Sequence, residues 1–294
     1  MSREFEVKYQ NKILRLDNNT RIMGILNITP DSFSDGGLYY NNIDNAVDRA
    51  RQMLDEGADI IDIGGESTRP GSKPITIKEE LNRIIPVIKN IRLSLRNSFF
   101  ISVDTYKAEV AEQALLAGAD MINSLSGFNF DRRLSKIIKK FKCPIIIYHI
   151  KGTPKIMQQD IHYKNVVKEI CHFFESQIDI AKKAGIGKNQ ILIDPGIGFG
   201  KTLKQNLELI VQLQKISKIG LPIVVSVSRK SHLGKLLKNE LKLDYVPTEL
   251  DRIEAALAET AIAVMEGAHI IRTHDVLQTK RFTVSLDALL RNKK

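Results

Sequence analysis

The chain has 294 residues, of which 43% are hydrophobic and 27% are charged. This balance is typical of a globular protein and excludes disordered, collagenous and coiled-coil chains. The length fits either two domains or one large α/β barrel. Cys143 and Cys171 lie in neither a C-x-x-C nor a metal-ligand spacing. A disulfide framework and a zinc ribbon are therefore excluded, and we expect a reducing, cytoplasmic location.

The net charge of +10 comes from 44 Lys and Arg residues against 34 Asp and Glu residues. The lysines are scattered through helix-like segments with no interleaved aromatic platform, so we interpret the charge as a solvated surface and expect no nucleic-acid partner. Residues 1–16 carry charges throughout, and no run of about 18 apolar residues occurs. We therefore expect neither secretion nor a membrane partner.

In chain order, residues 1–20 come first, as two short alternating segments on either side of residues 10–12. This pattern predicts a β-hairpin extension near the N-terminal mouth of the fold, before one domain of residues 21–294. Eight short apolar runs then predict buried parallel strands. They lie at residues 21–26, 58–64, 99–104, 119–124, 144–149, 190–194, 222–228 and 268–273.

The intervals between these runs space their apolar residues by three and four, which predicts helices. These helices are expected at residues 45–58, 77–91, 107–119, 131–141, 166–185, 206–216, 249–268 and 284–292. Four of them end at glycine, where a C-cap is expected. Strands and helices in this alternation predict an α/β fold, a single (β/α)8 TIM barrel with a short N-terminal β-hairpin. A doubly wound sheet is the alternative.

Two connections are too long to be simple turns. Residues 27–42 and 64–76 are rich in Gly, Pro and Ser, and they follow the first and second predicted strands. Long loops in compact domains are usually lids or binding loops. In a barrel, both would lie over the active-site face.

Polar side chains follow all eight predicted strands, at positions that converge on one mouth of a barrel. Carboxylates, amides and cations in combination suit a ligand with a hydrogen-bonding heterocycle and an anionic tail. Histidines are too few here for a metal hydrolase, but one Mg²⁺ held partly by phosphate fits. The residues are Asn27, Asp62, Glu66, Thr68, Arg69, Asp104, Asn123, His149, Asp194, Ser228, Arg229, Lys230, Arg272 and His274.

The stretch DPGIGFGKT at residues 194–202 looks like a phosphate-binding loop. Pro195 stands where the first glycine of that motif is required, so this interpretation fails, and the glycines do not fit G-x-G-x-x-G either. What is left is a glycine-rich turn that directs Asp194 to the mouth and lets Phe199 cover a ring.

Six stretches of the sequence carry a family resemblance: GILNITPDSFSDGG, IDIGGESTRPG, ISVDT, ILIDPGIGFGK, SRKS and IIRTHD. In this order and spacing they resemble the dihydropteroate synthase family of the folate pathway, over about residues 21 to 290. The family fold is an eight-stranded α/β barrel, which agrees with the strand count. The resemblance implies that p-aminobenzoate displaces pyrophosphate from 6-hydroxymethyl-7,8-dihydropterin pyrophosphate to give 7,8-dihydropteroate. It also implies Mg²⁺ as cofactor and a homodimer.

The same resemblance implies roles for single residues. Asp194 would accept from the amino-pyrimidine edge of the pterin, while Arg272 would lie across the ring face. The implied pterin site is Asp104, Asn123, Asp194, Phe199, Lys230 and Arg272. The implied catalytic residues are Asp104, Arg69 and Lys230.

The remaining substrate groups are assigned in the same way. Asn27 is the implied Mg²⁺ ligand. Pyrophosphate would be held by Asn27, Thr68, Arg69, Arg272 and His274. The p-aminobenzoate pocket would be formed by Phe33, Thr68, Pro70 and Ser231.

Three positions depart from the family pattern, namely Ser124, Tyr148 and Ser226. They bear on the apolar wall of the pterin pocket rather than on the reaction.

A pterin-binding methyltransferase that transfers a methyl group from methyltetrahydrofolate to a corrinoid is the alternative enzyme. That class does not need the S-T-R-P-G and N-I-T-P-D-S-F-S loops. A nucleic-acid-binding protein is a third possibility, and its binding would weaken steeply with salt.

Overall fold

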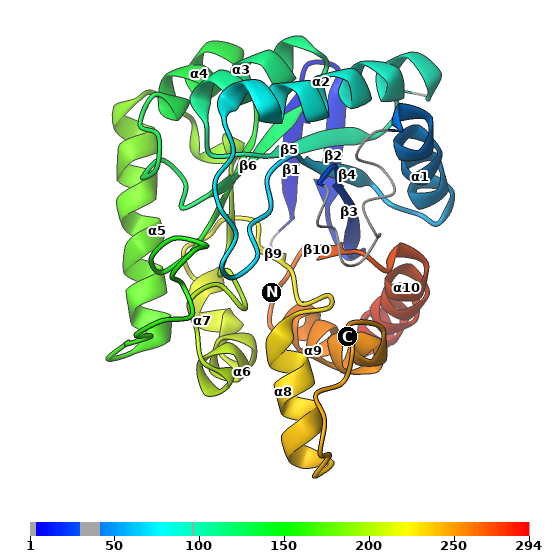
Figure 1. Cartoon of the computed structure of the whole chain (residues 1–294), viewed down its shortest axis with the longest axis vertical. Helices are drawn as coiled ribbons and strands as arrows, with labels where there is room; N and C mark the ends of the chain where they lie inside the picture. The colour runs from blue at the N-terminus through cyan, green and yellow to red at the C-terminus, as the bar shows by residue number, and fades with distance from the viewer. Residues whose placement is uncertain (1–3, 30–41, 96, 294) are drawn as a thin grey trace.

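A computed structural model describes residues 4–29, 42–95 and 97–293 of the chain. Eight parallel strands form one sheet in the order β8-β7-β6-β5-β4-β3-β10-β9, with helices around the outside (Figure 1). The strands are β3 (Arg21–Asn27), β4 (Ile60–Gly64), β5 (Phe100–Asp104), β6 (Met121–Leu125), β7 (Ile145–Tyr148), β8 (Ile191–Asp194), β9 (Val224–Val225) and β10 (Ile270–Thr273).

The two edges of this sheet meet. Ile193 in β8 forms a parallel bridge with Ile223, and its N–H donates to the carbonyl of Pro222 at 3.0 Å. The sheet is therefore a barrel, and the (β/α)8 prediction is confirmed over the doubly wound alternative. Because the carboxyl ends of parallel strands share one mouth, the polar residues at those ends are brought together.

The helices alternate with the strands. They are α1 (Ile43–Asp55), α2 (Ile77–Ser94), α3 (Ala108–Leu116), α4 (Leu134–Phe141), α5 (Val166–Lys183), α6 (Leu203–Val211), α7 (Leu213–Ser217), α8 (Ser231–Glu240), α9 (Ile253–Met265) and α10 (Val276–Asn292). Two 3₁₀ turns, η1 (Lys188–Gln190) and η2 (Leu250–Arg252), complete the order. The predicted glycine C-caps are confirmed, because Gly57, Gly118, Gly185 and Gly267 directly follow helices with φ of 101°, 114°, 75° and 107°.

The core lies between the strands and the inner faces of the helices. Strand β4 is buried along its whole length because the barrel interior covers one face and helices cover the other. Helix α2 turns Ile84, Val87, Ile88 and Ile91 inward at the spacing of an amphipathic helix. Each such side chain contributes about 1.5–3 kcal/mol when removed from water.

The N-terminal hairpin covers the end of the barrel opposite to the strand carboxyl ends. Its strands, β1 (Phe5–Tyr9) and β2 (Lys12–Leu16), are antiparallel. The Lys12 ammonium donates to Asp120 at 2.8 Å and to the carbonyl of Phe99 at 3.1 Å. These two acceptors precede β6 and β5, so the hairpin is fastened to the N-terminal mouth, as predicted.

The structure differs from the expected elements in a few places. Pairing in the seventh barrel strand is limited to Val224–Val225, because Pro222 lacks an N–H and the chain leaves the sheet before Arg229, whose φ is 58°. Helix α8 was not expected, and Gly234 interrupts its short apolar pattern. Helix α10 begins eight residues before the predicted 284–292 segment. A third long connection, residues 149–165, follows β7.

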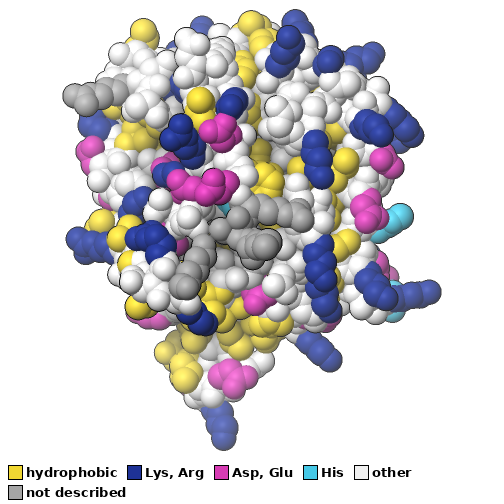
Figure 2. Space-filling view, turned by 180° about the vertical axis from the view of Figure 1, so that it is seen from behind, with side chains coloured by type: hydrophobic (Ala, Val, Ile, Leu, Met, Phe, Trp, Pro, Cys, Tyr) yellow, Lys and Arg dark blue, Asp and Glu magenta, His cyan; other side chains and the backbone are white. Residues whose placement is uncertain are grey.

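Within the residues described, no helix combines the length and the apolar character needed to cross a bilayer. Figure 2 shows lysine and arginine side chains dispersed over the face in view, among acidic and apolar side chains. This distribution agrees with a solvated basic surface.

Candidate active site

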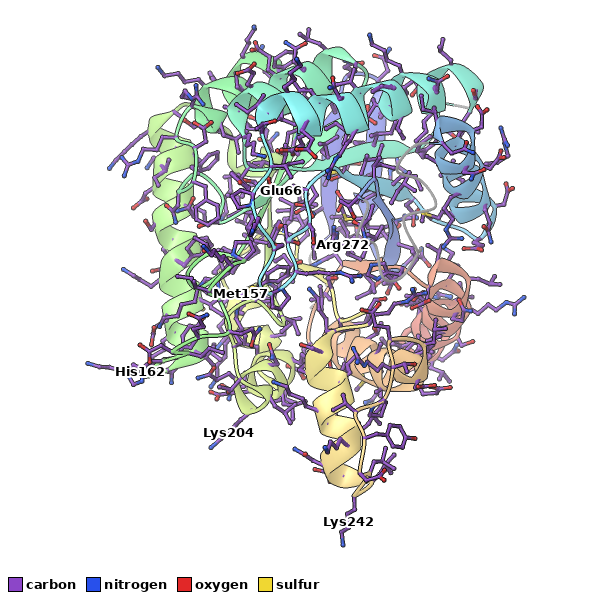
Figure 3. All side chains as sticks on the ribbon, viewed as in Figure 1. Glu66, Met157, His162, Lys204, Lys242 and Arg272 are labelled. Atoms are coloured by element: carbon purple, nitrogen blue, oxygen red, sulfur yellow. The ribbon has the colours of Figure 1, made fainter. Side chains whose placement is uncertain are left out.

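A cavity of 400 Å³ opens at the carboxyl ends of the barrel strands. Figure 3 places Arg272, Glu66 and Met157 near the middle of the barrel, and Lys204 and Lys242 at its periphery. Ten of the residues implied by the resemblance line this cavity. They are Asn27, Thr68, Arg69, Pro70, Asp104, Phe199, Lys230, Ser231, Arg272 and His274.

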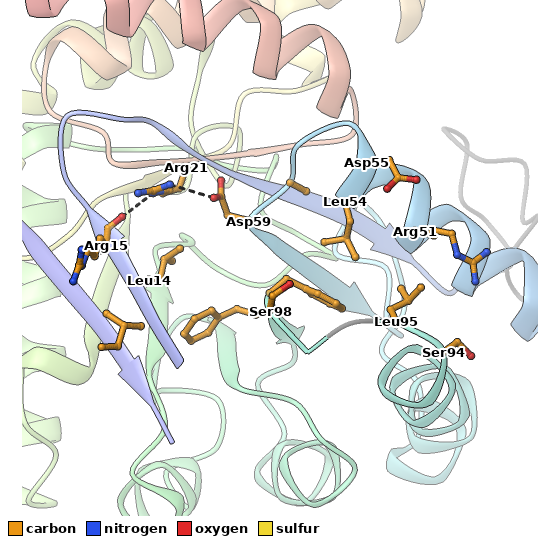
Figure 4. Close-up of a pocket in the computed structure, with 14 residues that line it drawn as sticks. Leu14, Arg15, Arg21, Arg51, Leu54, Asp55, Asp59, Ser94, Leu95 and Ser98 are labelled. Carbon is orange, nitrogen blue, oxygen red and sulfur yellow. Dashed lines mark hydrogen bonds and ion pairs between the residues drawn. The ribbon is translucent and has the colours of Figure 1, made fainter. Parts of the chain in front are cut away.

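A larger cavity of 810 Å³ lies at the other end of the barrel, beside the hairpin (Figure 4). Two of its charged side chains, Arg21 and Asp59, contact each other. Arg21 contacts Asp59 at 3.4 Å and donates to the carbonyl of Arg15 at 2.7 Å. None of its lining residues comes from the carboxyl end of a barrel strand, so we place the candidate site at the smaller cavity.

The Arg272 guanidinium joins the buried carboxylate of Asp62 to the largely buried carboxylate of Asp104 at the base of the site. Its Nε donates to Asp62 Oδ2 at 2.6 Å and its Nη2 donates to Asp104 Oδ2 at 2.8 Å. Asn123 Nδ2 donates to the same oxygen of Asp62 at 3.1 Å, and the Tyr148 hydroxyl donates to Asp104 Oδ1 at 2.9 Å. Five strands thus contribute to one polar network.

Three buried oxygen atoms in or near this network accept no hydrogen bond from the described part of the chain. Asp62 Oδ1 and Asn123 Oδ1 are buried and have no hydrogen-bond partner in the described part of the chain, and the same holds for Ser226 Oγ. Such groups are rare in folded proteins because each costs about 1–3 kcal/mol. They are therefore suited to the donors of a bound heterocycle.

Burial alters the ionisation of the site. It raises the pKa of Asp104 to about 7 against the opposing charge of Arg272, and it raises the pKa of Asp194 to about 6. Burial, together with the nearby charge of Arg272, lowers the pKa of Lys230 to about 7. Burial also lowers the pKa of His274 well below its usual value, so this imidazole is neutral near pH 7. The site can therefore change charge near neutrality.

The glycine-rich turn after β8 is built around a buried ammonium. Lys201 is 2% exposed, and its Nζ donates to the carbonyls of Gly196 at 2.8 Å and Phe199 at 2.9 Å. It also contacts His149 Nδ1 at 3.0 Å. Lys201 is thus an internal support of the turn rather than a phosphate ligand. The expectation that His149 faces the mouth is wrong, since this turn covers it.

The same turn places two predicted site residues. The N–H of Gly196 donates to Asp194 Oδ1 at 2.7 Å, which fixes that carboxylate at the end of β8. The Phe199 ring lies under Lys230, whose Nζ is 4.0 Å from the ring centroid. Asp194 and Asn123 are buried and do not line the cavity themselves. Asn123 is joined through Asp62 to Arg272, which does line it, and Asp194 interacts with the charges of Lys230 and Arg272.

A buried ion pair supports the loop at residues 64–76. The Lys107 ammonium contacts Glu66 at 2.6 Å and Glu80 at 2.5 Å, and Glu66 accepts from the N–H of Ile75 at 2.9 Å. The loop is closed on itself at its base, so Thr68, Arg69 and Pro70 are held at the cavity.

The segments after β9 and β10 are fastened to each other. The Arg229 guanidinium pairs with Asp275 at 2.6 Å, and Ser228 Oγ lies 3.2 Å from His274 Nδ1. These contacts explain why Lys230 and His274 lie at the same cavity although 44 residues separate them in the sequence.

The structure thus brings together all but one of the implied site residues. Phe33 lies outside the described residues. Asp62 is the main addition to the implied site: the sequence predicts that it lies at the mouth, but the resemblance gives it no role. The sequence carries a signal for this residue. The apolar run at residues 58–64 contains Asp59 and Asp62, and only Asp62 lies inside the strand that forms there, where it is buried. Met157 also lines the cavity, from the 149–165 connection, and no sequence signal pointed to it.

Comparisons with known proteins identify the family of the chain. A family model described as "Pterin binding enzyme" matches residues 23–274. A dihydropteroate synthase from Synechocystis sp. is 44% identical over 272 residues, which cover 92% of this chain and 91% of the relative. The matched residues include the strands and loops that form the cavity.

Solved structures are similar over nearly the whole chain. The Yersinia pestis dihydropteroate synthase in complex with a sulfonamide drug has a TM-score of 0.90 at 38% identity, and covers 98% of this chain and 100% of that chain. A Xanthomonas albilineans dihydropteroate synthase with 4-aminobenzoic acid has a TM-score of 0.87 at 35% identity, and covers 98% and 99%. The barrel and its hairpin therefore have close experimental counterparts.

Proposed function

The chain belongs to the dihydropteroate synthase family of pterin-binding enzymes, and from this we propose how its residues divide the reaction among them. The enzyme is a transferase of folate biosynthesis. It condenses 6-hydroxymethyl-7,8-dihydropterin pyrophosphate with p-aminobenzoate and releases 7,8-dihydropteroate and pyrophosphate. The relatives and solved structures are dihydropteroate synthases, so the comparisons favour this activity over the corrinoid methyltransferase that the sequence left open.

The observation that carries the residue assignment is the Arg272 bridge between Asp62 and Asp104, with free acceptors beside it. A pterin presents amino, ring N–H and carbonyl groups along one edge. We assign the amino-pyrimidine edge to Asp194 and the other ring nitrogens to Asn123 and Asp104. Charged acceptors give these contacts about twice the strength of neutral ones.

The remaining pterin contacts are assigned to other residues that line the same cavity. Lys230 lies over Phe199 and would donate to the acceptor side of the pterin ring. The Arg272 guanidinium is planar and lies at the cavity, where it would stack on the ring face as a lysine could not. Phe199, together with Tyr148, gives the pocket an apolar side.

We assign charge stabilisation of the transition state to Asp104. Early cleavage of the C–O bond leaves positive charge on the pterin methylene, delocalised into the ring. The Asp104 carboxylate is buried and held by two donors, so it can stabilise this charge without reorganising. The aniline nitrogen of p-aminobenzoate is neutral at pH 7, so the attack requires no strong base.

The leaving group requires cations and neutral hydrogen-bond donors, and among the residues assigned here the arginines supply the charge while Thr68 and the neutral His274 supply donors. Arg69, Thr68 and His274 line the cavity and would hold pyrophosphate oxygens together with Arg272. Arginine is suited to this because its fork binds phosphate in a bidentate manner.

Asn27 offers an amide oxygen at the same cavity. No cluster of three His, Cys, Asp or Glu side chains able to hold a metal occurs in the described part of the chain. This sparse donor set fits Mg²⁺, which keeps several waters and takes phosphate oxygens as ligands. We propose Asn27 as its protein ligand. When bound, Mg²⁺ would neutralise part of the pyrophosphate charge.

The second substrate would lie on the outer side of the cavity. Thr68, Pro70 and Ser231 are the described residues that we assign to p-aminobenzoate, and Phe33 is assigned from the resemblance alone. The Xanthomonas relative was solved with 4-aminobenzoic acid and the Yersinia relative with a sulfonamide. We therefore expect sulfonamides to compete with p-aminobenzoate here.

We extend the proposal to a cytoplasmic homodimer, on family resemblance. Exposed apolar side chains on α9 and α10, among them Met265 and Leu289, support an interface on that side. Light scattering should give twice the chain mass of 33.2 kDa. A mass equal to one chain would contradict the dimer.

The activity is tested by incubating the purified protein with the pterin pyrophosphate, p-aminobenzoate and Mg²⁺ and separating products by chromatography. Dihydropteroate should form only when both substrates are present. Chelation of Mg²⁺ should slow its formation, and undiminished product after chelation would remove the metal from the proposal.

A further inference from the structure

The Tyr148 hydroxyl and the Arg272 guanidinium hold opposite oxygens of the Asp104 carboxylate. Tyr148 donates to Oδ1 at 2.9 Å and Arg272 donates to Oδ2 at 2.8 Å. A carboxylate held in this way cannot rotate about its Cβ–Cγ bond without losing a charge-assisted hydrogen bond. Its plane is therefore set by two strands other than its own, β7 and β10.

Tyr148 reaches Asp104 across an intervening strand. Asp104 in β5 pairs with Asn123 in β6, and Tyr148 in β7 pairs with Leu125 of the same β6 strand. Neighbouring strands lie about 4.8 Å apart, so the contact spans roughly two such steps. A phenol is long enough for this span and carries a donor at its tip.

The Tyr148 ring is itself fixed. The residue is 4% exposed, and its ring lies 5.4 Å from that of Phe199 in a tilted arrangement. Both rings belong to an apolar cluster separate from the main core, with Leu125, Ile150 and Met157. Phe199 and Met157 line the cavity, so the cluster forms its apolar side.

We infer that Tyr148 is a positioning residue of the active site, whose hydroxyl orients the Asp104 carboxylate toward the pterin while its ring supports Phe199. The catalytic meaning of this inference rests on the proposed role of Asp104. The contact between the two side chains does not depend on that role, and it can be tested separately.

The hydroxyl also affects the charge of Asp104. Burial raises the pKa of Asp104 to about 7, and the Arg272 charge and the Tyr148 hydrogen bond both act to lower it. Burial raises the pKa of Tyr148 well above its usual value, so the phenol stays protonated and remains the donor. Loss of the hydroxyl should therefore move the pKa of Asp104 upward.

Other charged groups face Asp104 and remain in place when the hydroxyl is removed. Asp62 from β4 and Glu80 from α2 raise the pKa of Asp104. Lys230, after β9, also interacts with its charge. If the Tyr148 hydroxyl is removed and its ring is kept, a shift in the pKa of Asp104 can therefore be assigned to the hydroxyl alone.

Tyr148→Phe keeps the ring and removes only the hydroxyl. We expect kcat at pH 7 to fall about tenfold, as for loss of a hydrogen bond to a charged group. The acidic limb of the kcat profile should move to higher pH, so the deficit should shrink as the pH rises. Tyr148→Met removes the ring as well, and should also raise KM for the pterin substrate.

Tyr163→Phe is the matched control. The Tyr163 hydroxyl oxygen is buried and has no hydrogen-bond partner in the described part of the chain, and its ring lies under the Lys151 ammonium, outside the cavity. The same change of atoms there should leave kcat and the position of the acidic limb unchanged.

A direct readout separates this inference from the role of Asp104. Carbon-13 NMR of aspartate-labelled enzyme follows the Asp104 carboxyl, which is identified by its absence in Asp104→Asn. The Asp104 inflection should lie at higher pH in Tyr148→Phe than in the unaltered enzyme. An unchanged inflection would overturn the inference, whatever the kinetics. Full turnover by Asp104→Asn would overturn only the catalytic role of Asp104.

Discussion

A Cβ atom added to Gly196 would lie 1.8 Å from the carbonyl oxygen of His149. The glycine-rich turn therefore packs backbone against backbone at the point where it places Asp194. Since a carbonyl oxygen cannot move aside as a flexible side chain can, this position requires glycine both for space and for its φ of 68°.

Gly196→Ala should lower the free energy of unfolding by about 3 kcal/mol or more, and should weaken pterin binding by displacing Asp194. Gly71→Ala is the matched control, because Gly71 also has a positive φ, of 82°, but has no atom within 4 Å of its Cβ position. That variant should lose only about 1–2 kcal/mol. Equal losses in denaturant unfolding followed by circular dichroism would show that the close approach to His149 is not the cause.

Lys107→Met should destabilise the fold by about 3 kcal/mol at pH 8, because Glu66 and Glu80 lose their buried partner. Lys140→Met is the control, since its pair with Glu112 is exposed on the lysine side and should be worth under about 1 kcal/mol.

The deficit of Lys107→Met should depend on pH. Burial raises the pKa of Glu80 above its usual 4.5, and Lys107 opposes that rise. A carboxyl whose pKa is raised in the folded protein makes its full contribution to the free energy of unfolding below pH 4.5. That contribution is lost as the pH rises through the pKa of the carboxyl in the folded protein. Without Lys107 the pKa of Glu80 in the folded protein rises further. The loss of unfolding free energy in Lys107→Met should therefore be smaller at pH 5 than at pH 8. The reverse order would contradict the buried pair.

Arg69→Ala should reduce kcat by roughly 100-fold, because the departing pyrophosphate loses a bidentate cation. Arg69→Lys should recover only part of the rate. Arg133→Ala, on the exposed surface beside Asp131, should leave kcat unchanged. A normal rate for Arg69→Ala at saturating substrates would show that pyrophosphate lies elsewhere.

The value of kcat/KM for the pterin substrate should decline as the pH falls through 7 and 6. The carboxylates of Asp104 and Asp194 must be ionised to bind and stabilise the ring, and burial raises their pKa values to about 7 and about 6. Since kcat/KM reports the free enzyme, its acidic limb should lie near these values. A limb near pH 4, where exposed carboxyls titrate, would show that neither group is required in its charged form.

Much of the fold could be predicted because its signals are local. Apolar runs such as residues 99–104 identify strands that are buried on both faces, and the alternation with helical spacing leaves few topologies. The polar residues that follow the strands identified the mouth, because parallel strands in a barrel share their carboxyl ends. Helix α8 was missed since Gly234 weakens its periodicity.

The contacts that complete the site could not be predicted, because they join segments far apart in the chain. The Tyr148 hydroxyl meets Asp104 across β6, and Lys201 meets His149 inside a turn that sequence spacing does not reveal. His149 follows its strand as the proposed site residues do, and only packing shows that it is covered.

The most direct measurement is a crystal structure of the enzyme with the pterin pyrophosphate and Mg²⁺. We expect the pterin edge on Asp194 and Asn123, Arg272 against the ring, and the pyrophosphate between Arg69, His274 and Asn27. A pterin bound in the 810 Å³ cavity beside the hairpin, or at this mouth with its edge away from Asp194, would contradict this expectation.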